Sequence, residues 1–180
     1  MTTYYPGIGT FSSTKKFNIS GNILSLLYGD NYKGIYNVPN SNTLFQELFK
    51  NTKIVNAKDL LLVANKLPNK CYYGMFRGCN LLKTIPALPA MVLNEYCYGF
   101  MFENCTSLNS TPKLPATTLE KYCYWAMFKG CTSLTSAPKL PATTLMDSCY
   151  GSMFSGCSSL LSAPILPATT LTSSCYYGMF

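Results

Sequence analysis

The sequence predicts an α/β solenoid, in which coils of about 26 residues, each a short strand and a short helix, stack behind an N-terminal cap. The main observation is that cysteine, methionine, phenylalanine, leucine and proline recur at one constant interval from position 71 onward. In addition, 48% of the 180 residues are hydrophobic, which is enough for a buried core. A disordered chain is therefore not expected.

The repeat is clearest in columns, where one residue type returns at the same place in every unit. An earlier, degenerate copy begins at Leu44 and reaches Leu67 after one extra residue near Asp59. We therefore divide the chain into a cap or docking segment over residues 1–43 and about five coils over residues 44–180. The columns include Cys71, Cys97, Cys123, Cys149 and Cys175, and Met75, Met101, Met127, Met153 and Met179.

Within one unit, Leu119, Cys123, Met127 and Cys131 recur every four residues, which is typical of one face of an α-helix. This spacing predicts a short helix over 119–129, started by the threonines at 117 and 118. The residues after the helix tolerate the left-handed conformation that ends many helices. They are Gly78, Asn104, Gly130 and Gly156, with Asn51 in the degenerate copy.

The rest of each unit predicts a strand of three or four residues, for example over 134–137. Pro138 should end it, because proline has no N–H for a ladder hydrogen bond. Ahead of the repeats, residues 16–19 predict a brief strand and residues 22–29 a short helix stopped by Gly29. At the other end, Cys175 opens a sixth coil, and we expect a longer chain or another copy to cover it.

At these residues the chain resembles the BspA-like leucine-rich repeats of bacterial surface and phage-encoded proteins. The match runs from Met75-Phe76-Arg-Gly-Cys79 through Leu82 to Leu88-Pro89, and it repeats over about 44–180. Methionine stands where that family commonly has alanine. The resemblance implies a leucine-rich-repeat-like, right-handed solenoid that serves in adhesion or protein recognition, because that family is mostly non-enzymatic.

The nine cysteines have three interpretations. Two cysteines of one unit, such as Cys71 and Cys79, lie about 12 Å apart along a helix, too far for a disulfide. Zinc sites favour two to four intervening residues and often use histidine, which this chain lacks. We therefore expect buried free thiols, no metal site and no cofactor, with disulfides between neighbouring coils as the alternative.

Catalysis and nucleic-acid binding are not expected. The seven carboxylates are scattered, and a cysteine or serine nucleophile has no histidine to activate it. We predict no catalytic residue and no enzyme, and keep a carbohydrate-processing domain as the rival class. The net charge of +7 lies entirely in residues 1–83, where it marks either an anionic partner or a solvated surface. It is too dilute for a nucleic-acid interface.

Binding residues in a solenoid are expected where the columns vary. Large and small residues alternate beside the Cys-Tyr pair, and lysines stand between the proline and leucine of two units. We predict a partner-binding surface that includes exposed aromatic and cationic side chains, and ordinary packing between loops is the alternative. The candidate residues are Tyr73, Lys113, Trp125, Lys139 and Tyr177.

The biological setting is predicted from what the sequence lacks. No apolar stretch approaches the roughly 20 residues that span a bilayer, and no export signal follows Met1. We expect a bacteriophage virion component of the tail or fibre, made in the bacterial cytoplasm. The alternative is a bacterial cell-surface adhesin of the BspA-like type. The expected partner is a protein of the virion or host surface, and a surface glycan is a second class.

Overall fold

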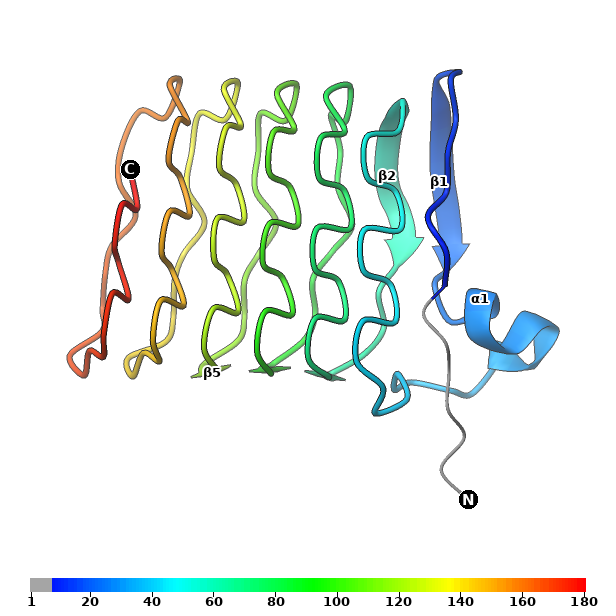
Figure 1. Cartoon of the computed structure of the whole chain (residues 1–180), viewed down its shortest axis with the longest axis horizontal. Helices are drawn as coiled ribbons and strands as arrows, with labels where there is room; N and C mark the ends of the chain where they lie inside the picture. The colour runs from blue at the N-terminus through cyan, green and yellow to red at the C-terminus, as the bar shows by residue number, and fades with distance from the viewer. Residues whose placement is uncertain (1–7) are drawn as a thin grey trace.

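The computed structural model describes residues 8–180 and places successive segments of the chain side by side in one row (Figure 1). The fold is α/β, with little helix and short parallel strands. Its described helices are α1 (Ser25–Tyr28) and the adjoining 3₁₀ helix η1 (Gly29–Tyr32), and both precede the repeats. They lie at one end of the row, and the C terminus lies at the other (Figure 1).

Five parallel strands form two small sheets. In the first sheet β1 (Phe17–Asn22) pairs with β2 (Ile54–Leu61). The second sheet has the order β3 (Lys66–Leu67), β4 (Val92–Leu93) and β5 (Thr118–Leu119). Residues one period apart pair directly in this second sheet, so neighbouring coils stand in the register that the sequence predicts.

The predicted helix over 119–129 is wrong, because the chain makes a run of consecutive turns there. Tyr122, Ala126 and Gly130 have φ values of 59°, 52° and 71°, and a left-handed residue at every fourth position is incompatible with an α-helix. We name these runs the turn wall. It comprises residues 43–52, 70–79, 96–105, 122–131, 148–157 and 174–180.

Alternating hydrogen bonds explain the turn wall. The N–H of Met127 donates to the carbonyl of Tyr124 in its own coil at 3.2 Å, and the next N–H, of Phe128, donates to Met153 of the following coil at 3.0 Å. A turn every four residues and a helix both place residues four apart on one side, so the sequence pattern could not separate them. Hydrogen bonds between coils offset the cost of left-handed residues, about 1–2 kcal/mol each.

The strand predicted over 134–137 is also wrong. The short strands lie just before the turn wall instead, and β5 includes Thr118, one of the threonines expected to start a helix. We name the extended stretches opposite the turn wall the proline wall, residues 84–90, 110–116, 136–142 and 162–168. Its prolines lack N–H groups, so few hydrogen bonds join neighbouring coils there. Strand β2, the matching stretch of the first coil, has no proline and forms a full strand.

The N-terminal segment lies against the first coil. The predicted strand and helix are confirmed as β1 and α1, and Gly29 ends α1 with a φ of 55°. The N–H groups of Ile8 and Phe11 donate to Leu44 and Leu48 at 3.2 and 2.7 Å, so this segment repeats the hydrogen bonds that join later coils. The division of the chain at residue 43 stays a prediction.

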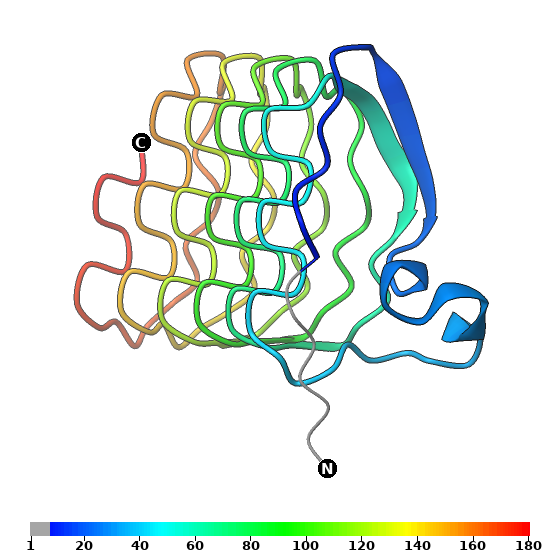
Figure 2. The same ribbon diagram turned by 45° about the vertical axis from the view of Figure 1, so that its right-hand side comes forward.

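Successive coils follow nearly the same path (Figure 2), and the core between the two walls consists of stacked columns of buried side chains. The rings of Phe76, Phe102 and Phe128 stack at successive centroid distances of 5.6 and 5.6 Å. The rings of Phe45 and Tyr72 also stack, although their separation in the sequence exceeds the regular period, which agrees with an insertion in the degenerate copy. Identical side chains therefore pack on one another from coil to coil, and the methionine column is buried throughout.

Candidate binding surface

The structure separates the five predicted site residues into three places. Tyr73 and Trp125 lie on the turn wall, and Lys113 and Lys139 lie on the proline wall. Tyr177 lies on the last run of the turn wall, residues 174–180, where 69% of it is exposed. The five residues therefore do not form one surface.

The aromatic residues of the turn wall pack on one another. Tyr73 contacts the rings of Tyr96 and Phe100 at 6.1 and 5.3 Å, and Tyr96 stacks on Tyr122 at 4.6 Å. Trp125 contacts Tyr122 and covers Gly151 of the next coil so closely that a Cβ there would collide with the indole. Tyr73 lies over Gly99 less tightly, with 3.3 Å between its Cδ2 and a Cβ placed at Gly99. The large and small alternation in the sequence therefore reflects packing between coils.

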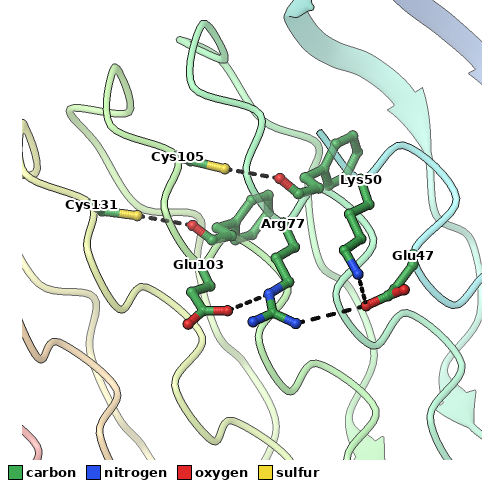
Figure 3. Close-up of polar contacts among 8 residues, drawn as sticks. Glu47, Lys50, Arg77, Glu103, Cys105 and Cys131 are labelled. Carbon is green, nitrogen blue, oxygen red and sulfur yellow. Dashed lines mark hydrogen bonds and ion pairs between the residues drawn. The ribbon is translucent and has the colours of Figure 1, made fainter. Parts of the chain in front are cut away.

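Four charged side chains of the turn wall form a network of ion pairs (Figure 3). Arg77 Nε lies 2.5 Å from Glu103 Oε2, and its Nη1 lies 3.9 Å from Glu47 Oε1, which also accepts from Lys50 Nζ at 2.8 Å. Glu103 is buried, so this ion pair lies partly below the surface. The guanidinium of Arg77 also lies 5.3 Å from the ring of Phe100. This network ties together the first three coils.

A second exposed pair, just before the turn wall, joins two further coils. Lys121 Nζ lies 2.9 Å from Asp147 Oδ2. Their hydrogen bond lowers the pKa of Asp147 and raises the pKa of Lys121, because it favours the charged form of each group. These cations are therefore engaged within the protein.

All nine cysteines are buried free thiols, as the sequence predicts. The Sγ atoms of Cys105 and Cys131 donate to the carbonyls of Phe76 and Phe102 in the preceding coil, both at 3.1 Å (Figure 3). This contact gives the cysteine column a structural role that alanine could not fill. Because the turn wall is not helical, the distance along a helix no longer explains why two cysteines of one unit form no disulfide.

The thiols are poorly suited to nucleophilic chemistry. Burial raises the pKa of Cys97 and of Cys149 to about 12, and that of Cys157 to about 11. A thiol with such a pKa is protonated at neutral pH, and the thiolate is the reactive form. Among residues 8–180, no group of three or more His, Cys, Asp or Glu side chains is arranged to hold a metal ion.

A hollow surface with exposed lysines lies on the proline wall. Two adjoining grooves share Thr111, Pro112, Lys113 and Pro115. We name them together the proline groove. It is lined by Lys58, residues 84–89, residues 110–115, Pro138, Lys139 and Pro141, which come from four successive coils.

The proline groove has an apolar floor and exposed lysines. Pro86 and Leu88 are buried, whereas Ala87 between them is exposed, and Lys113 takes the place of Ala87 in the next coil. Lys113 and Lys139 form no ion pair within the described part of the chain, and no acidic or aromatic residue lines the groove. Of the predicted site residues, these two lysines are the ones that line a groove together.

Sequence reasoning missed the groove as a whole. It identified the two lysines as members of a variable column, but not Lys58, which comes from the degenerate copy. The sequence feature that could have indicated the groove is the pair of prolines in each unit, with one exposed residue between the first proline and the leucine.

Comparisons with family models, curated proteins and solved structures find no match to this chain. The resemblance to BspA-like repeats therefore stays a prediction. No helix in residues 8–180 is long and apolar enough to cross a membrane.

Proposed function

We propose that the chain is a leucine-rich-repeat-like solenoid that acts as a non-enzymatic protein-interaction scaffold, with the proline groove as its binding surface. The solenoid class is supported by hydrogen bonds that recur from coil to coil, as from Tyr72 to Cys97 and from Tyr98 to Cys123. The parallel pairing of β3, β4 and β5 gives the same register. Such repeats commonly present an extended surface to a partner.

The observation that carries this function is the difference between the two walls. On the turn wall, Tyr73 and Trp125 pack on neighbouring side chains and Lys50 and Arg77 form ion pairs, whereas Lys129 is a single exposed cation. The proline groove instead combines an apolar floor with exposed lysines from three coils. Apolar hollows with a few polar groups at the rim are the usual form of a recognition site.

A non-enzymatic role is supported by the state of the buried thiols and of three carboxylates. The carboxylates of Glu47, Glu103 and Asp147 are engaged in ion pairs, and burial keeps the thiols protonated. General acid–base catalysis needs a carboxyl or thiol free to exchange a proton with substrate. The carbohydrate-processing alternative usually needs a pair of carboxyl groups, and no carboxyl residue lines the proline groove.

The binding role can be tested with a groove-filling variant. Ala87→Trp places an indole in the groove, and Lys129→Trp places one at an exposed position of the turn wall as the matched control. A displayed library of random peptides is selected on the immobilised wild-type protein. We expect binders that lose affinity for Ala87→Trp and keep it for Lys129→Trp. Peptides whose affinity is unchanged by both substitutions would show that they bind elsewhere, and this would contradict the proposal.

For the setting, we propose a phage virion component of the tail or fibre, with a BspA-like bacterial cell-surface adhesin as the alternative. The two differ in where the protein is found. Mass spectrometry of purified phage particles should detect the chain in the first setting. Detection in bacterial envelope fractions alone would contradict it.

A further inference from the structure

We infer that the proline groove binds an extended, acidic segment of a partner polypeptide. This inference rests on the proposed function, because it names the partner of the same surface. Three features of the groove support it, namely its charge, its apolar floor and its direction across the coils.

The charge of the groove favours an anionic partner. Lys113 and Lys139 occupy equivalent positions in adjacent coils and are exposed. Lys58 adds a third cation at the other end, and its ion pair with the exposed Asp59 is a loose one of 4.0 Å. With no carboxylate among the lining residues, the lysines face an open hollow, so an anionic segment gains attraction from all three.

The floor of the groove favours a polypeptide among anionic partners. Partly exposed or exposed side chains such as Ile85, Pro89 and Pro112 supply apolar surface that small aliphatic side chains can cover. Single-stranded nucleic acid is bound through aromatic side chains on which bases stack, and no aromatic residue lines this groove. A segment that mixes acidic and aliphatic residues fits both the floor and the rim.

The direction of the groove favours an extended segment. Neighbouring coils stand about 4.8 Å apart where their strands pair. The groove crosses four coils from Lys58 to Lys139, which corresponds to about 14 Å, or four to five residues of extended chain. Because proline removes backbone donors from this wall, binding should rest on apolar contact and ion pairing more than on added strand hydrogen bonds.

The test uses a labelled peptide of alternating Glu and Val and a matched peptide with Gln in place of Glu. Binding is measured by fluorescence anisotropy to the wild-type protein, to the double variant Lys113→Glu/Lys139→Glu and to the control Lys129→Glu. We expect the Glu peptide to bind and to lose about tenfold or more in affinity for the double variant. The control should change affinity by about twofold at most, and added salt should weaken binding.

Each of the other outcomes would contradict one part of the proposal. Equal binding of the Gln peptide would refute the acidic partner and leave the proline groove as a binding surface. Polyphosphate that binds as tightly, with the same dependence on both lysines, would refute the polypeptide in favour of a general anion site. If neither peptide binds, the inference fails, while the library selection on Ala87→Trp still tests the proposed function. Unchanged circular dichroism of the double variant establishes that it folds.

Discussion

The indole of Trp125 lies over Gly151 of the next coil, in a space that no larger residue at position 151 could share. A looser form of this contact joins Tyr73 and Gly99, with a distance of 3.3 Å between Tyr73 Cδ2 and a Cβ placed at Gly99. Aromatic residues that look like binding candidates in the sequence are therefore partly explained by packing.

Gly151→Ala should destabilise the protein by about 1–3 kcal/mol, because the added methyl group forces the indole or the backbone to move. Thermal or urea unfolding measures the change. Gly9→Ala is the control, since nothing lies within 4 Å of a Cβ at that position. If the two variants unfold alike, the indole moves aside freely and the packing role of Trp125 is wrong.

Arg77→Ala should cost about 2–4 kcal/mol of unfolding free energy, because it leaves the buried carboxylate of Glu103 without its cation. Lys50→Ala is the matched control at the same network, and removing this more exposed pair should cost less than about 1 kcal/mol. Adding Glu103→Gln to Arg77→Ala should recover part of the loss. Equal effects of the two single substitutions in urea unfolding would refute the buried pair.

Stability should fall as the pH rises above about 9. Burial raises the pKa of eight thiols above their ordinary value of 9.0, so the folded protein holds protons that the unfolded chain releases. Each thiol then lowers the unfolding free energy by about 1.4 kcal/mol per pH unit until its folded pKa is passed. The eight are Cys71, Cys79, Cys97, Cys105, Cys123, Cys131, Cys149 and Cys157.

Urea unfolding under reducing conditions, repeated from pH 7 to pH 11, measures this loss. An unfolding free energy of about 5–15 kcal/mol, typical of small domains, should fall to zero within about one to two pH units above 9. Unfolding should also release nine thiols to a labelling reagent at pH 8, where the folded protein reacts slowly. A flat pH profile, or four disulfides among the nine cysteines, would contradict the buried thiol columns.

Tyr124→Phe should stabilise the protein by about 1–2 kcal/mol, because a buried hydroxyl without a partner costs free energy that phenylalanine avoids at nearly the same shape. The hydroxyls of Tyr72, Tyr98, Tyr124 and Tyr150 are buried and have no hydrogen-bond partner among the described residues. Tyr177→Phe, at an exposed position, is the control and should change nothing in urea unfolding. A loss of stability in Tyr124→Phe would mean that the hydroxyl has a partner, such as a buried water molecule.

The period in the sequence predicts which residues meet, but not the path of the chain between them. Leu67, Leu93 and Leu119 pair in register, as the constant repeat interval requires. The helix over 119–129 failed because a turn every four residues gives the same four-residue pattern. Gly74 and Gly78, both left-handed and four apart, mark the turn run in the one unit that has glycine at both places.

The binding surface was predictable only residue by residue. Lys113 and Lys139 share a variable column, which indicates exposure, and both are exposed. Their association with Lys58 depends on how the degenerate first copy sits against the second, and no spacing in the sequence gives that. Likewise, the alternation of Trp125 and Gly151 is visible in the sequence, whereas its cause is a contact between coils.

The contact of Trp125 with Gly151 also decides how this array can grow or shrink. Removing a single coil would bring the large residue of one unit to the place where a glycine lies now, as with Tyr73 beside Trp125. Removing two neighbouring coils restores a large residue facing a glycine. The unit that can be gained or lost without a mismatch is therefore a pair of coils, and arrays of this kind should lengthen in even steps.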